Sequence, residues 1–263
     1  MNALRTFLLL PLFFSLLMTA PNAFADELPP NYTVYEMRTY YAHEGKLDAL
    51  HKRFRDHTLK LFTEAGMQNV IYLSPVENDD NSMTYLLGYH SRDQRKAAWK
   101  TFLDNPEWKA AYKASIAEGK LVKKIESVFY EPTDYSPQYS QAFAGVKKEP
   151  ARLFERRTYT TNEGKLPNLD ARFRDHTCAL FKKHGIENVI YLHPMKGQPG
   201  HGNTLTYFIA HKDQAARDAS FDGFRKDADW KSAREASEKD GKIMVAGGVQ
   251  HRFLAPTDYS PIQ

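Results

Sequence analysis

The chain contains an internal repeat. Residues 36–73 align with residues 155–192 at a constant offset of 119, and 23 of the 38 aligned residues are identical. The longest shared run, Arg-Phe-Arg-Asp-His-Thr, occupies residues 53–58 in the first copy and 172–177 in the second. Repetition over such a length indicates a duplicated structural unit, and a unit of roughly a hundred residues can enclose its own core. The sequence therefore predicts two copies of one domain.

The segment before the first copy has the layout of a secretory signal peptide. Residues 1–25 carry one charge, at Arg5, then an apolar run over residues 7–18, and small residues at Ala23 and Ala25. The run is too short for a membrane-spanning helix, which needs ~20 apolar residues. We therefore expect cleavage near Ala25, export to the periplasm or the medium, and no stable membrane anchor afterwards.

The two copies are separated by a stretch without periodicity. Residues 136–150 combine Pro, Gly, Gln and Lys, a composition that is typical of a linker. We therefore expect the first domain over residues 31–135 and the second over residues 151–259. Both copies end in the same motif, Thr-Asp-Tyr-Ser-Pro, at residues 133–137 and 257–261.

Each copy shows the same succession of strand and helix patterns. Residues 32–41 alternate and are rich in Tyr, Thr and Val, which predicts a strand. Residues 47–61 then carry an apolar stripe at helical spacing, and Gly66 ends the predicted helix. The further elements expected in the first copy are strands at 70–73 and 83–89, a helical region over 92–118 interrupted near Pro106, and a strand at 127–130.

This order, βαββαβ, predicts the ferredoxin-like split motif, an α+β unit in which helices cover one face of an antiparallel sheet. The other face of the sheet is bare and needs a partner. Because the second copy offers the same bare face, we expect the two sheets to pair as an α/β-barrel pseudo-dimer with the helices outside, or to pair between chains in a homo-oligomer.

The first strand of each copy carries a polar set at every second position. In the first copy this set is Glu36, Arg38 and Tyr40, and in the second copy it is Glu155, Arg157 and Tyr159. If the alternate residues face the helices, the polar set lines the cavity between the sheets, where it can hold an anionic or carbonyl ligand. The alternative is an ion pair between neighbouring strands beneath a packed tyrosine.

The shared helix places a histidine on the flank of its apolar stripe. A helical wheel puts His57 beside the stripe with Arg53 one turn earlier, and the second copy repeats them as His176 and Arg172. We expect both histidines to be half-buried. Such an imidazole can act as a general base or simply hydrogen-bond to a backbone carbonyl. No nucleophile partners these histidines in the sequence, so no catalytic residue is assigned.

Several classes of site lack support in the sequence. Cys178 is the only cysteine and stands where the first copy has Leu59, which favours a packing role. The chain has no Cys-x-x-Cys or His-Glu-x-x-His motif and no glycine-rich phosphate loop, so we predict no metal and no cofactor. The formal charge of +4 is scattered along the chain, which gives no electrostatic case for nucleic acid.

The shared motifs resemble those of the NIPSNAP family. They are Tyr-Glu-Met-Arg-Thr-Tyr at 35–40, Glu-Gly-Lys-Leu at 44–47, Arg-Phe-Arg-Asp-His-Thr at 53–58 and Pro-Glu-Trp-Lys at 106–109, and the second copy repeats them at 154–159, 163–166, 172–177 and 229–231. The resemblance implies ferredoxin-like units that pair into a dimeric α/β barrel. It implies no general reaction and no catalytic residues. Related dimeric α/β-barrel families include cofactor-free monooxygenases and haem enzymes, an analogy of fold alone.

Two functions follow from these patterns. The first is a binding module of the cell envelope that holds a small organic ligand or a protein partner. The second is a cofactor-free oxygenase-type enzyme that acts on an organic substrate in the cavity between the sheets. An enclosed polar cavity there favours the enzyme, whereas a space filled by side chains disfavours it.

Overall fold

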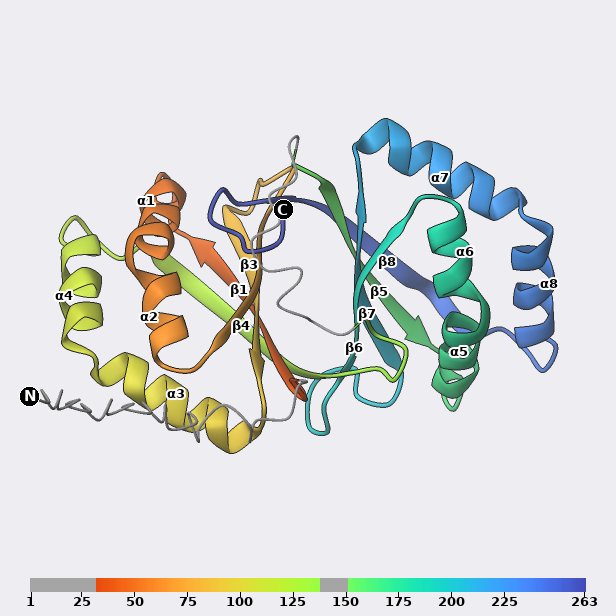
Figure 1. The fold of residues 1–263 in the computed structure, drawn as a ribbon, viewed down its shortest axis with the longest axis horizontal. Coiled ribbons are helices and arrows are strands. Elements are labelled where there is room, and N and C mark those ends of the chain that lie inside the picture. The colour runs from red at the N-terminus through yellow and green to blue at the C-terminus, as the bar shows by residue number, and fades with distance from the viewer. Residues whose placement is uncertain (1–31, 138–150) are drawn as a thin grey trace, which may run out of the picture.

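Eight antiparallel strands close into a single barrel in the computed structural model, which describes residues 32–137 and 151–263 (Figure 1). The strand order around the barrel is β1-β3-β2-β8-β5-β7-β6-β4. Each half of the chain supplies four neighbouring strands, and helices cover the outside of each four-stranded sheet. The predicted pseudo-dimer of two α+β units is confirmed. The predicted signal peptide, 1–25, and most of the predicted linker lie outside the described residues.

The first half has the predicted βαββαβ order. Its elements are β1 (Val34–Ala42), α1 (Leu47–Arg53), the π-helical turn η1 (Phe54–Thr58), α2 (Leu59–Glu64), β2 (Gln68–Pro75), β3 (Ser82–Tyr89), α3 (Arg92–Asp104), α4 (Pro106–Ser115) and β4 (Val122–Pro132). The break between α3 and α4 lies where the sequence predicts it. Asn105 caps α4 by accepting a hydrogen bond from the backbone N–H of Glu107 at 2.8 Å, and Pro106 occupies the first turn.

The second half repeats this order. Its elements are β5 (Leu153–Thr161), α5 (Leu166–Arg172), η2 (Phe173–Thr177), α6 (Cys178–Lys183), β6 (Glu187–Pro194), β7 (Thr204–His211), α7 (Gln214–Lys226), α8 (Ala228–Ser237) and β8 (Met244–Pro256). The halves join where β2 pairs with β8 and β4 pairs with β6, each over three residue pairs. These two short seams close the barrel.

The shared Arg-Phe-Arg-Asp-His-Thr run forms a π-helical turn in both halves. In the first half, the buried Thr58 hydroxyl donates to the backbone carbonyl of Arg53, five residues earlier, at 3.1 Å. Thr177 makes the same bond to the carbonyl of Arg172 at 3.1 Å. The wide turn replaces the single regular helix that the apolar stripe predicts, and π-helical turns of this kind are frequent at functional sites.

The polar set of β1 faces the helices. Tyr35 and Met37 belong to the apolar cluster between the two sheets, whereas Tyr40 belongs to the cluster beneath the helices. The prediction that the polar sets line the space between the sheets is therefore wrong for the first half, and for the second half too, where Glu155 bonds to Arg217 on α7. The reason is that sheet pairing removes the inner face from water, so the more apolar face lies inside.

The two Thr-Asp-Tyr-Ser-Pro motifs cross between the halves, and we call them the crossing tails (residues 133–137 and 257–261). Tyr259 packs in the helix–sheet core of the first half, and Tyr135 packs in that of the second. Asp258 accepts two hydrogen bonds of 2.7 Å from Arg55 of the first half. The other tail makes the equivalent pair of 2.7 Å bonds with Arg174. Each half thus completes the core of the other.

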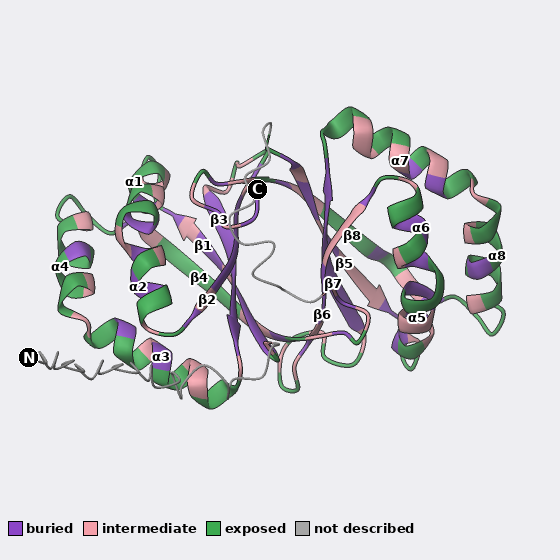
Figure 2. Cartoon of the chain, in the orientation of Figure 1, coloured by how far each residue is buried: buried purple, intermediate pink, exposed green. Residues whose placement is uncertain are grey.

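Burial is concentrated on the strands and on the inner sides of the helices (Figure 2). The outer sides of the helices are exposed. Within the described part of the chain, no helix combines the length and the apolar character that a membrane span requires.

Candidate functional site

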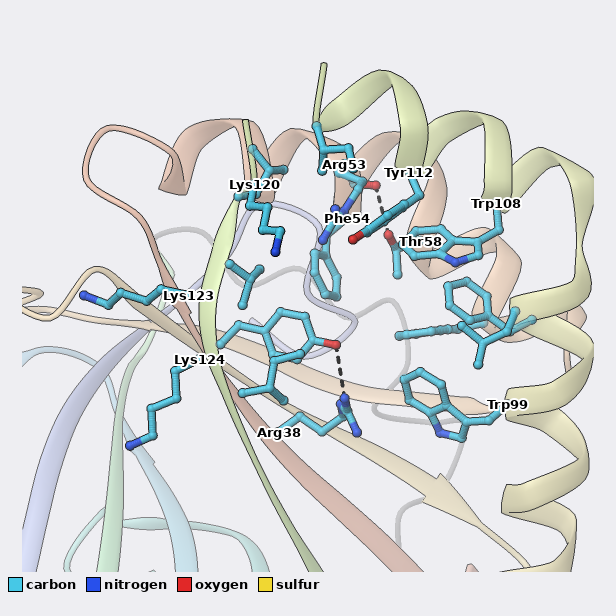
Figure 3. Close-up of a pocket in the computed structure, with 18 residues that line it drawn as sticks. Arg38, Arg53, Phe54, Thr58, Trp99, Trp108, Tyr112, Lys120, Lys123 and Lys124 are labelled. Atoms are coloured by element: carbon cyan, nitrogen blue, oxygen red, sulfur yellow. Dashed lines mark hydrogen bonds between the residues drawn. The ribbon is translucent and has the colours of Figure 1, made fainter. Parts of the chain in front are cut away.

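A pocket of about 510 Å³ lies between the sheet and the helices of the first half (Figure 3). This volume is within the range of small-molecule sites, which is roughly 300–1,000 Å³. The lining comes from β1, α1, η1, α2, α3, α4, the segment that follows α4 and the start of β4, so the π-helical turn forms part of the wall. The pocket opens on the helical side of the sheet, away from the space between the two sheets.

Seven of the eighteen residues that line the pocket are aromatic. Trp99 and Phe102 come from α3, and Trp108 and Tyr112 come from α4. The rings of Phe102 and Trp108 lie 4.3 Å apart between centroids, which holds the two helices together at this point. Phe54 adds a further ring from the π-helical turn. These walls suit a ligand with a flat, apolar body.

Arg53 brings a positive charge into this apolar setting. The residue is 5% exposed, and its guanidinium lies 5.4 Å from the ring centroids of Trp108 and Tyr112. One guanidinium nitrogen donates to the hydroxyl of Ser115 at 3.2 Å, but Nε has no hydrogen-bond acceptor. Burial lowers the pKa of Arg53. In the described ranges, no carboxylate forms an ion pair with this side chain.

Arg38 lies on the floor of the same pocket and shares one carboxylate with another arginine. Glu36 is fully buried and accepts hydrogen bonds from Arg38 at 2.5 Å, from Arg95 at 2.8 Å twice, and from Ser127 at 2.7 Å. Burial raises the pKa of Glu36, but the two arginines outweigh it and hold the pKa below its usual value. Two cations and one anion leave a net positive charge beneath the pocket.

Lysines add positive charge at the rim. Lys120, Lys123 and Lys124 contribute to the lining and are exposed, and Lys124 pairs with Glu126 at 2.6 Å. In Figure 3, Lys120 lies on the side of the pocket near Arg53, whereas the other two extend away from the aromatic walls. The eighteen lining residues include no carboxylate, imidazole or thiol. The pocket is therefore cationic as well as aromatic.

The second half differs at the residue that matches Arg53. Arg172 is also buried, but Glu238 lies 3.7 Å from its guanidinium and supplies a counter-charge. At an offset of 122, Glu238 takes the place of Ile116 in the first half. The buried arginine thus has a carboxylate nearby in the second half, shared with Arg234, and none at the matching place in the first. Comparison of the two copies at this position offered the signal, and the sequence reasoning did not use it.

The predicted polar residues fall into two groups. Arg38, Tyr40 and Arg53 line the pocket, and Glu36 supports it from below. Their counterparts in the second half keep much of the local bonding: Arg157 pairs with Glu155 and donates to the Tyr159 hydroxyl at 3.0 Å. Arg38 of β1 and Arg53 of α1 thus lie in one site, and this site is on the helical face of the sheet.

The predicted histidines lie outside the pocket. His57 is half-buried, as expected, but His176 is exposed, so the expectation of two half-buried rings is wrong for the second half. Exposure follows from their place in the π-helical turn, whose buried members are Phe54 and Thr58. In the same helical segment, His51 contacts the hydroxyls of Tyr259 at 2.7 Å and Ser74 at 3.2 Å.

In the second half, the histidine and its hydrogen-bond partner exchange positions between helix and strand. Asp170 stands where the first half has His51, and it accepts hydrogen bonds from the Tyr135 hydroxyl at 2.7 Å and from His193 at 3.0 Å. His193, which stands where the first half has Ser74, therefore serves as the hydrogen-bond partner of Asp170. Among residues 32–137 and 151–263, no three His, Cys, Asp or Glu side chains converge as a metal site. Burial raises the pKa of Cys178 to about 11, which suits a packing residue.

Comparison with known proteins identifies the repeated unit. The NIPSNAP family model matches residues 35–137 and 154–261. No curated protein matches the chain in sequence. An uncharacterized NIPSNAP domain protein from Burkholderia xenovorans is 24% identical, and the match covers 40% of this chain and 99% of that one with a TM-score of 0.36.

Two solved structures match both halves together. An anthrone oxidase-like protein is 11% identical with a TM-score of 0.56, and the match covers 89% of this chain and 95% of that one. A monooxygenase-like protein from Lactobacillus acidophilus NCFM is 9% identical with a TM-score of 0.53, covering 86% and 94% of the two chains. Because identity is so low, these matches establish the barrel fold alone.

Proposed function

We propose, from the premise that this chain belongs to the NIPSNAP family, that it is a small-molecule-binding module whose ligand occupies the aromatic pocket of the first half. The family membership accounts for the fold and for the two tandem domains. The fold is shared with oxygenase-like proteins, but a fold does not carry its chemistry with it. The function is therefore argued from the pocket itself.

The observation that carries the proposal is the combination of a pocket of about 510 Å³ with a wall of tryptophan and tyrosine rings. Burial of an apolar ligand surface against such rings contributes roughly 25 cal/mol per Å² of apolar area. A few polar groups, here Arg38, Arg53 and the Tyr40 hydroxyl, then fix the orientation of the ligand. The predicted export supports a role in the cell envelope, where such a module would hold a small organic compound.

The enzyme alternative receives less support from the same residues. A cofactor-free oxygenase needs a group that takes a proton from its substrate. Of the groups that serve this purpose, the described residues that line the pocket include tyrosine and lysine but no carboxylate or imidazole, the commoner bases. The space between the sheets, where that alternative places the substrate, contains the apolar cluster around Tyr35, Met37 and Phe154.

A matched pair of tryptophans tests the proposal. Trp108 lines the pocket, and Trp230 is its counterpart in the second half, with nearly the same distance to a phenylalanine ring, 4.3 and 4.4 Å. Titration with the neutral fluorescent probe N-phenyl-1-naphthylamine should show binding that Trp108→Leu weakens about tenfold, since the wall loses a ring worth ~1–1.5 kcal/mol. Trp230→Leu should leave the affinity unchanged. Equal effects of both substitutions would contradict the proposal.

A further inference from the structure

The matching buried arginines, Arg53 and Arg172, have different surroundings in the two halves. In the second half, Glu238 lies 3.7 Å from Arg172 and also 3.6 Å from Arg234. In the first half, Ile116 and Tyr112 occupy the positions of that glutamate and that second arginine. Both of these replacements line the pocket. The pocket wall is therefore apolar and aromatic at the place where the second half holds its own carboxylate.

An unpaired guanidinium in an apolar pocket is costly unless an anion joins it. Arg53 is 5% exposed, and its contacts to Trp108 and Tyr112 are those of a cation over aromatic rings. Nε has no acceptor in either Arg53 or Arg172, so it is the nearby carboxylate that distinguishes the two halves. Glu36 cannot serve, because it already receives the hydrogen bonds of Arg38 and Arg95. No carboxylate of the described residues interacts with Arg53, which leaves its guanidinium available to an anionic ligand.

We infer that the ligand of this pocket is an organic anion with an aromatic or otherwise flat apolar body, and that its carboxylate or sulfonate binds Arg53. The inference rests on the proposed function and adds the charge and the shape of the ligand to it. The anionic group supplies to Arg53 the counter-charge that Glu238 supplies to Arg172, so the chain binds one such ligand, in the first half. Lys120 at the rim attracts the anion as it enters.

The chain supplies two independent ways to remove the anion site. Arg53→Met keeps an unbranched apolar side chain, shorter than arginine, and removes the charge. Ile116→Glu introduces the carboxylate of the second half, which should pair with Arg53 and compete with the ligand. The control is the double variant Arg172→Met with Glu238→Gln, which removes both charges of the internal pair in the second half.

Two probes of nearly the same shape separate charge from apolar binding. The anionic probe is 1-anilinonaphthalene-8-sulfonate, and its neutral analogue is N-phenyl-1-naphthylamine, which lacks the sulfonate. Because a hydrogen bond to a charged group contributes ~1.5–3 kcal/mol, Arg53→Met and Ile116→Glu should each weaken the anionic probe by about tenfold to a hundredfold. The neutral probe should change by less than about threefold, and the control should change neither.

The outcomes distinguish the inference from the proposed function. If the neutral probe binds in a Trp108-dependent manner but neither variant weakens the anionic probe, the pocket binds apolar molecules and the anion site is refuted. If neither probe depends on Trp108, the proposed function fails as well. Circular dichroism of each variant shows whether it is folded, and Ile116→Glu decides the question if Arg53→Met does not fold.

Discussion

The crossing tail at the end of the second half, residues 257–261, should stabilise the first half, and Tyr259 is the residue with which to measure this. Its ring packs against Tyr72 and Phe54, with centroids 5.6 and 6.5 Å apart, and its hydroxyl lies 2.7 Å from Nδ1 of His51. Burial raises the pKa of Tyr259, so the hydroxyl remains protonated and can donate to that nitrogen. We consider two truncations, Tyr259→Phe and Tyr259→Ala.

The magnitude follows from what each truncation removes. Tyr259→Phe removes one hydrogen bond and should lower the free energy of unfolding by about 1 kcal/mol. Tyr259→Ala also removes the ring, and buried aromatic residues cost ~3–5 kcal/mol when replaced by alanine. Because the ring is only partly buried, we expect about 3 kcal/mol, at the lower end of that range.

Urea unfolding with tryptophan fluorescence measures these losses in the half that receives the tail. In a Trp230→Phe background, the remaining tryptophans, Trp99 and Trp108, both belong to the first half. Val249→Ala, at a residue 46% exposed, is the surface control and should change stability by no more than about 0.5 kcal/mol. A loss for Tyr259→Ala no larger than that for Tyr259→Phe would refute the idea that the tail completes the first core.

Two further predictions concern buried ionisable groups. Glu36→Gln should lower the free energy of unfolding by about 3 kcal/mol, because two guanidinium groups would lose their shared carboxylate; a loss below about 1 kcal/mol in urea unfolding would contradict this. Burial lowers the pKa of His51 below the 6.5 of an unperturbed histidine, so the unfolded chain binds more protons as the pH falls through 6.5. Its contribution to stability is complete above that pH and declines below it, and His51→Gln should therefore show a smaller loss of stability between pH 7 and pH 5 than the wild type. An equal loss in both proteins would count against the depressed pKa.

The architecture was predictable from the repeat, because two copies of a βαββαβ pattern leave two bare sheet faces that must be covered. The facing of β1 was not. The face of Tyr35 and Met37 is the more apolar, but the sequence alone does not say whether that face packs on the helices or on the other sheet. Arg95 on α3 decides the facing, since it binds Glu36 on the helical side. That contact joins residues 59 positions apart and leaves no local pattern.

The second copy illustrates the same limit. Arg156 stands where the first copy has Met37, and on the face between the sheets it lies opposite Arg252, which bonds to Asp80 of the other half at 2.9 Å. The surroundings of a charged residue on the inner face are known only when the pairing of the two sheets is known. The pocket could not be predicted from one copy either. Its charge depends on a carboxylate, Glu238, that is present in the second half and replaced by Ile116 in the first.

The two seams that join the halves have a consequence for how this protein can change. A symmetric assembly of two separate chains receives every mutation twice, and its two sites must remain identical. Here a single chain contains both units, so a substitution alters one site at a time. The matched positions 116 and 238, which hold isoleucine and glutamate, are an example. One unit is free to acquire a specialised ligand while the other is preserved as its structural complement.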